Sequence, residues 1–134
     1  MLVGGTEVVE VDLSTADGPA HLVSTAGEDL GVLVNNVGFV HPRPDGFGSV
    51  TDQMWHQTLE LDLMAHVRAI RAALPVMVAR GGGSIVNIGS ANARLDDPLV
   101  VDYSAAKAAH VNLAKALSSE FGDQGIRVNT INPG

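Results

Sequence analysis

The stretches SIVNIGS (84–90) and YSAAK (103–107), in which Ser90 stands 13 residues before Tyr103, decide the fold of this chain. The first is a short apolar, β-branched run of the kind found in strands that are buried on both faces. The second opens an alanine-rich segment with helical character. Short β-rich runs alternate with longer helical ones along the whole chain, which predicts a parallel sheet covered by helices.

Three strands are expected to form the core of that sheet, at 32–35, 84–89 and 127–131. A further short strand is indicated by Val8, Val9 and Val11, and it ends at Asp12. A helix is expected from about Asp17 to Asp29.

Two longer helices follow in the sequence. The first begins near Thr51 or Asp52 and continues to about residue 80, and Pro75 should kink or end it. The second covers 103–121, with Asp102 as its N-cap. Its small residues on every face are typical of a helix that packs closely against the sheet and against a second surface, such as a partner subunit.

Composition narrows the possible functions. The 134 residues fit one domain, 1–134, with 46% hydrophobic and 17% charged residues. A formal charge of −7 argues against nucleic acid as a partner. No apolar run approaches the roughly 18 residues of a membrane span. Cysteine is absent, which excludes disulfides and thiol catalysis, and the five histidines lack metal-site spacing, so no metal is expected. A cytoplasmic protein is the expectation.

Tyr103 and Lys107 are four residues apart at the start of a helix, so they lie on one face and can interact. A free tyrosine has a pKa of about 10, and a nearby ammonium group lowers it. Such a tyrosine can act as a general acid toward a developing alkoxide. Ser90, which follows a buried strand, could hold a substrate carbonyl by a hydrogen bond.

These motifs together resemble the short-chain dehydrogenase/reductase family. The segment LVNNVG looks like the family's Asn-Asn-Ala-Gly turn, and YSAAK matches its Tyr-xxx-Lys motif. The segment SIVNIGS is similar to the strand that presents its catalytic serine. The resembling segments, in the family's order and spacing, are 33–38, 55–63, 84–90, 103–107 and 127–134.

The resemblance implies an NAD(P)-dependent oxidoreductase that interconverts a carbonyl and an alcohol. Tyr103 would be the acid/base, Ser90 would orient the carbonyl, and Lys107 would lower the tyrosine pKa and bind the nicotinamide ribose. The other implied cofactor contacts are Asp12 and Leu13 at the adenine, Asn35 and Gly38 near a ribose, and Pro133 and Gly134 at the end of the sixth strand. A homo-oligomer would form through helices 52–80 and 103–121.

Asp62 stands where the family has its fourth catalytic residue, an asparagine. Asp is isosteric with Asn, so a role of the backbone carbonyl could survive, but the side chain adds a negative charge near Lys107. We expect Asp62 to weaken catalysis without abolishing it. The alternative is that Asp62 merely caps a polar helix face.

The family's glycine-rich turn, Thr-Gly-xxx-Gly-x-Gly, has no equivalent here, and this turn brings a helix N-terminus to the pyrophosphate. The resemblance therefore predicts an incomplete Rossmann-like, three-layer parallel sheet that runs from the family's third strand to its sixth. The third and fourth strands would be about 14 Å apart without the two between them. Residues 8–11 then either find a new neighbour or form no sheet strand.

Two alternatives stay open beside the enzyme. The chain could be a catalytically silent fragment or an assembly module that does not bind the dinucleotide by itself. It could also be an enzyme whose start was chosen too far downstream, as Met1, Leu2 and Val3 suggest. The choice between NAD and NADP and the identity of the substrate are not encoded in these motifs.

Overall fold

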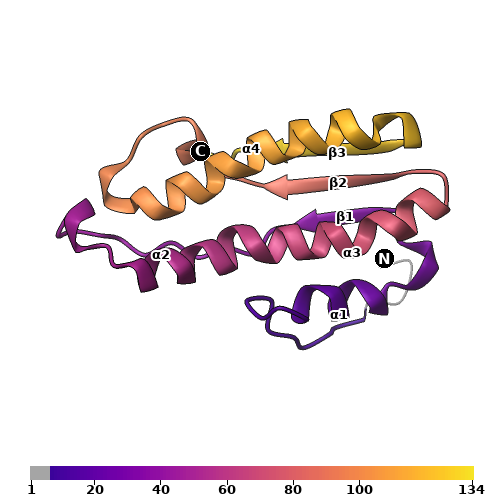
Figure 1. The fold of residues 1–134 in the computed structure, drawn as a ribbon, viewed down its shortest axis with the longest axis horizontal. Helices are drawn as coiled ribbons and strands as arrows, with labels where there is room; N and C mark the ends of the chain where they lie inside the picture. The colour runs from indigo at the N-terminus through magenta and orange to yellow at the C-terminus, as the bar shows by residue number, and fades with distance from the viewer. Residues whose placement is uncertain (1–6) are drawn as a thin grey trace, which may run out of the picture.

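The fold of this chain is available as a computed structural model, which describes residues 7–134 (Figure 1). Met1, Leu2 and Val3, on which the downstream-start possibility rests, lie outside the described residues. Within them, no helix is both long and apolar enough to cross a membrane.

Three parallel strands form the sheet: β1 (Val32–Asn35), β2 (Gly83–Ile88) and β3 (Ile126–Ile131), in the order β1-β2-β3. Asn35 pairs with Asn87 across β1 and β2, and Ile88 pairs with Ile131 across β2 and β3. The carboxyl ends of all three strands therefore meet at one edge of the sheet. The predicted core strands are confirmed to within one residue at each end.

The helices connect these strands. The α-helices are α1 (Gly18–Thr25), α2 (Asp52–Leu59), α3 (Ala65–Ala79) and α4 (Val101–Phe121), and shorter helical turns lie at Gly27–Asp29, Phe47–Ser49, Glu60–Met64, Ala91–Ala93, Pro98–Val100 and Gly122–Gln124. Thr51 caps α2 as predicted, because its side chain accepts a hydrogen bond from the Met54 N–H.

The helices α3 and α4 run along one face of the sheet, α1 packs against α3, and α2 lies beyond the carboxyl ends of the strands (Figure 1). Their shared core contains Ile85 and Ile126 from the sheet and Ala73 and Met77 from α3. Burying one aliphatic side chain of this size contributes roughly 1.5–3 kcal/mol to stability. The opposite face of the sheet is open, since Val32, Val34 and Ile131 are exposed. The sheet and the helices on one of its faces are thus two of the three layers that the sequence predicts, within the described residues.

Residues 8–11 form no strand, so the second of the two expectations for this segment is confirmed. Val8 is 88% exposed, whereas Val9 and Leu13 turn toward α1 and β1. Alternating valines favour a strand, but a strand needs a neighbour for its backbone groups. The free edge of β1 is not paired with this segment.

Pro75 was expected to kink or end its helix. It does not end the helix, because α3 continues through Pro75 to Ala79. Ala73 and Met77, on either side of the proline, are completely buried. Their packing compensates for the backbone hydrogen bond that proline cannot make. The regular helix is instead interrupted upstream, by a π-helical turn at Glu60–Met64.

The predicted N-cap at Asp102 is also wrong. The helix α4 begins one residue earlier, at Val101, with Val100 as its N-cap. Asp102 lies inside the first turn and is only 1% exposed. Its carboxylate makes long-range contacts with Arg43 and Thr58 instead of capping the helix.

Candidate functional site

Lys107 is at the centre of a buried polar group beneath the carboxyl edge of the sheet. It is only 2% exposed, and its Nζ lies 3.6 Å from Asp62 Oδ1. The same nitrogen donates to the Ile88 carbonyl at the end of β2, at 3.4 Å. It also lies 5.4 Å from the centre of the Tyr103 ring, one turn earlier on α4. The expected contact between Tyr103 and Lys107 is therefore present.

Asp62 lies in the π-helical turn between α2 and α3 and is 1% exposed, so it does not cap a polar helix face. Its Oδ1 accepts a hydrogen bond from the Phe39 N–H at 3.0 Å. Burial raises the pKa of Asp62, and the charge of Lys107 opposes that shift. Burial likewise lowers the pKa of Lys107, and the Asp62 carboxylate opposes it. The charge of each group therefore offsets part of the effect of burial on the other, which makes Asp62 the direct partner of Lys107.

Gly38 allows the chain after β1 to approach this pair closely. A Cβ atom at Gly38 would lie 2.6 Å from Asp62 Oδ1 and 2.9 Å from Lys107 Nζ, so a larger residue would force the two side chains to shift. The predicted cofactor residue Gly38 and the predicted catalytic residues Asp62 and Lys107 thus form one compact group. The backbone of the Asn-Asn-Val-Gly turn lies directly against the lysine.

Ser90 follows β2 and lies two residues beyond the carbonyl that Lys107 contacts. Its hydroxyl accepts a hydrogen bond from the Asn92 N–H at 3.2 Å, and its own N–H donates to Asn132 Oδ1 at 3.3 Å. The hydroxyl caps a short 3-10 turn in this state and is not hydrogen-bonded to Tyr103 or Lys107. The hydroxyl of Ser90 also lies 3.5 Å from the side-chain oxygen of Asn92, to which it can donate.

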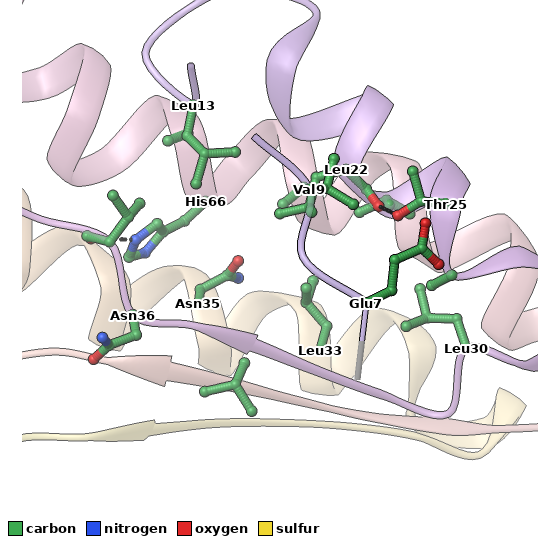
Figure 2. Close-up of a pocket in the computed structure, with 16 residues that line it drawn as sticks. Glu7, Val9, Leu13, Leu22, Thr25, Leu30, Leu33, Asn35, Asn36 and His66 are labelled. Atoms are coloured by element: carbon green, nitrogen blue, oxygen red, sulfur yellow. Dashed lines mark hydrogen bonds between the residues drawn. The ribbon is translucent and has the colours of Figure 1, made fainter. Parts of the chain in front are cut away.

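A pocket of about 440 Å³ lies beside the free edge of β1, and Figure 2 shows its lining. Leu13 and Asn35, two of the predicted cofactor residues, both line it, together with His66. Asp12 does not line the pocket. It is exposed, and hydrogen bonds from Ser14 lower the pKa of its carboxyl.

Pro133 and Gly134, the last predicted cofactor residues, follow β3 on the side of Ser90. The Pro133 carbonyl accepts a hydrogen bond from the Ala91 N–H at 2.7 Å. This contact ties the end of β3 to the turn after β2. Gly134 is exposed beside it.

Sequence reasoning missed the histidines around this site. His66 and His110 are 1% and 0% exposed, and their ring centres are 4.4 Å apart. The Nε2 atom of His66 lies 2.7 Å from the Val37 carbonyl, which holds the turn after β1 against α3. The position of His66, one helical turn after Asp62, was the only sequence signal for it. His110 is 44 residues away in the sequence, and nothing in its spacing points to His66.

Arg43 stands between two prolines, a sequence context that favours a solvated loop residue, but the structure shows a buried contact instead. Its side chain is 12% exposed and forms an ion pair with Asp102 at 2.6 Å. The flanking prolines favour a loop, and residues 38–46 do form one, but they do not reveal that the arginine turns inward.

The described residues lack the part of a dinucleotide site that binds the pyrophosphate. The Gly38 approach and the buried ammonium of Lys107 suit a group with hydroxyls near the carboxyl ends of β1 and β2. Within residues 7–134, however, no strand is followed by a glycine-rich turn that opens a helix. The residues therefore fit the nicotinamide–ribose half, and the pyrophosphate half has no counterpart here. Likewise, no group of three or more potential metal ligands occurs in this part of the chain.

Comparisons with known proteins agree with this geometry. Residues 4–134 match the family model described as short chain dehydrogenase. The oxidoreductase YvrD of Bacillus subtilis is 34% identical over 125 residues, which cover 92% of this chain and 47% of that protein. The 2,5-dichloro-2,5-cyclohexadiene-1,4-diol dehydrogenase LinX of Sphingobium indicum is 34% identical over 134 residues, with 98% and 53% covered.

A solved structure from Beutenbergia cavernae, which contains NADP at low occupancy, superposes with a TM-score of 0.90 at 34% identity. The superposition covers 98% of this chain and 53% of that one. The chain spans about half the length of the curated relatives it matches. Motifs, fold and comparisons agree, and the chain belongs to the short-chain dehydrogenase family.

Proposed function

We propose that this chain carries the proton-transfer half of an NAD(P)-dependent oxidoreductase that interconverts a carbonyl and an alcohol. The observation that carries the proposal is the buried Lys107, placed between Asp62, the end of β2 and the Tyr103 ring. A fully buried lysine is costly unless it is paired. Titratable groups with strongly perturbed pKa values cluster at functional sites. The NADP in the related structure supports the cofactor class.

In this proposal Tyr103 donates its phenolic proton to the oxygen of a carbonyl that is being reduced, or accepts it in the reverse direction. Lys107 stabilises the negative charge left on the phenol oxygen. Ser90 donates a hydrogen bond to the same substrate oxygen after leaving Asn92. The nicotinamide, when bound, supplies or accepts the hydride. Asn35 and Gly38 line its approach from β1, and Asp12, Leu13, Pro133 and Gly134 are the remaining proposed contacts.

The alternative, a fragment that does not bind the dinucleotide by itself, is separable by titration. The comparison uses two proteins: the 134-residue chain, and a chimera in which residues 4–134 replace the matching segment of the diol dehydrogenase LinX. We expect NADH or NADPH to bind the chimera in the micromolar range and the 134-residue chain far more weakly. Equally tight binding by both would show that the pyrophosphate contacts are not needed. Absence of binding by a well-folded chimera would contradict the proposal.

Replacing Asp62 by asparagine should increase turnover by the chimera, by about tenfold, the factor that one pKa unit represents. The change removes a negative charge 3.6 Å from Lys107 Nζ that opposes the effect of the ammonium on Tyr103, while the Ile88 carbonyl remains as an acceptor for Nζ. The Phe39 N–H still finds an oxygen acceptor in asparagine. The measurement is kcat as a function of pH. An unchanged or lower kcat would contradict a weakening role for Asp62.

We also propose that two copies of the chain associate through α3 and α4. A groove of about 540 Å³ runs between these helices, and Leu74, Leu113 and Leu117 line it. Arg71 and Glu120 also line the groove, and they carry opposite charges. In a twofold dimer the same patch faces itself, so Arg71 of one copy can meet Glu120 of the other.

Reversing one of these charges tests the dimer. Arg71→Glu should raise the dimer dissociation constant about tenfold, which corresponds to about 1.4 kcal/mol. In this variant the new carboxylate at position 71 of each copy faces Glu120 of the other copy, so the repulsion occurs at two symmetric places. The double variant Arg71→Glu/Glu120→Arg restores opposite charges and should restore association. Sedimentation of the 134-residue chain measures both. A wild-type monomer at every concentration, or no difference among the variants, would count against this interface.

A further inference from the structure

A second buried ion pair lies outside the Lys107 group and has no role in the proposed reaction. Arg43 donates to Asp102 Oδ2 from Nη2 at 2.6 Å and from Nε at 3.2 Å. The Thr58 hydroxyl donates to the same oxygen at 2.7 Å. The three side chains come from the loop after β1, from α2 and from the first turn of α4. They therefore join three separate parts of the chain at one carboxylate oxygen.

The loop between β1 and α2 is also anchored by its backbone. The Arg43 N–H donates to the Leu99 carbonyl at 2.6 Å, just before α4 begins. Four residues earlier, the Phe39 N–H donates to Asp62 Oδ1. Residues 39–43 thus form a strap that is fixed to the partner of Lys107 at one end and to the residue preceding Tyr103 at the other.

The chemistry of this pair favours a positioning role over a stabilising one. Asp102 is 1% exposed, and burial raises its pKa, but the hydrogen bonds from Arg43 and Thr58 and the charge of Arg43 outweigh burial and hold the pKa below its ordinary value. Both partners are therefore charged. A buried ion pair is seldom more stable than apolar residues of similar size, because desolvation cancels most of the attraction. What the pair adds is a fixed geometry at the start of α4.

We propose that Arg43, Asp102 and Thr58 are positioning residues, which hold the start of α4 so that Tyr103 stays next to Lys107. This inference rests on the proposed function, in which Tyr103 is the acid/base. None of the three touches the reacting groups. They act through the strap and through the backbone that joins Asp102 to Tyr103.

The test uses the 134-residue chain and follows Tyr103 by NMR, because Tyr103 is its only tyrosine and its labelled ring gives the only tyrosine signals. The readout is the nuclear Overhauser contact between the ring and the Lys107 methylenes. Arg43→Met alone leaves the Asp102 charge buried, and Tm should fall by roughly ten degrees or more. The double variant Arg43→Met/Asp102→Leu removes both charges and should recover most of that loss.

The double variant separates the two roles. If the pair positions Tyr103, the recovered protein still loses more than half of the Tyr103–Lys107 contact intensity. If the double variant recovers Tm and keeps the full intensity, the pair is merely structural and the proposal is overturned. The matched control is Arg68→Met/Glu60→Leu, which removes a more exposed ion pair of 2.7 Å on the neighbouring helical segments and should leave the contact unchanged.

A milder substitution decides the matter if the double variant does not fold. Thr58→Val keeps the ion pair and the volume of the side chain but removes one hydrogen bond to Asp102. A measurable loss of the Tyr103–Lys107 contact in this variant supports positioning, and an unchanged contact overturns it. The outcome is independent of turnover by the chimera. Failure of the positioning role and failure of the proposed reaction are therefore distinguishable.

Discussion

Tyr103→Phe is expected to lower kcat of the chimera by roughly 100- to 10,000-fold, the usual contribution of a positioned general acid or base. Phenylalanine keeps the ring that packs beside Lys107 and removes only the hydroxyl. Tyr103 is the only tyrosine in the chain, so no other phenol within it can replace the lost group. The measurement is the rate of NAD(P)H formation with the diol substrate of LinX.

The control for this substitution is binding of the cofactor. Because the ring remains, the dissociation constant for NADPH should change by less than about threefold. A loss of turnover with unchanged binding assigns the hydroxyl to the chemical step. If kcat of Tyr103→Phe stays within about threefold of the unsubstituted chimera, Tyr103 is not the acid/base.

The second large effect is expected in acid. Burial, with a smaller contribution from the charge of Lys107, lowers the pKa of His66 and of His110 to about 4. In the unfolded chain the histidines have a pKa of about 6.5. Between this value and about 4 the unfolded chain therefore binds protons that the folded chain does not bind. The free energy of unfolding should therefore be at its plateau above pH of about 6.5 and fall as pH drops toward about 4. The difference corresponds to roughly 3 kcal/mol for one ring.

His110→Leu should flatten this acid limb and raise stability at neutral pH. Neither ring nitrogen of His110 has a hydrogen bond of good geometry to a described residue, although the Asp62 carbonyl is near. Leucine has a similar volume and no polar atom to satisfy, so a gain of about 1–3 kcal/mol is expected. Urea unfolding between pH 4 and 8 measures both effects.

The matched control for His110→Leu is His56→Leu, because His56 is exposed on α2. This control should leave the acid limb unchanged. An acid limb of equal steepness in His110→Leu would show that His110 does not contribute to it. Asp102 contributes separately and at lower pH, since the pKa of its carboxyl is lowered and that contribution is lost only as pH falls below the value of an unfolded aspartate, about 3.9.

Local sequence patterns were sufficient to predict the sheet and the helix that carries Tyr103 and Lys107. The short apolar runs at β1, β2 and β3 have the pattern of buried strands. The four-residue spacing of Tyr103 and Lys107 places both side chains on one face of α4. The same local reasoning predicted a strand at residues 8–11, where the missing information was the neighbouring strand. A pattern can show that a segment is able to form a strand but not that a partner is present.

The rest of the site depends on contacts between residues far apart in the sequence. Arg43 and Asp102 are separated by 59 residues, and each has an ordinary local role in its own segment. The π-helical turn that buries Asp62 is likewise invisible in the pattern of α2 and α3, which reads as one continuous helix. Long-range pairing of charges needs the folded chain, because burial decides which charges require a partner.

The most direct test of the central claim is the turnover of the unsubstituted chimera, measured as NAD(P)H formation from the LinX diol. If residues 4–134 carry a working proton-transfer half, the chimera turns over, and turnover depends on Tyr103 and Lys107. A chimera that folds and binds NADPH, yet is no faster than its own Tyr103→Phe variant, would contradict the account.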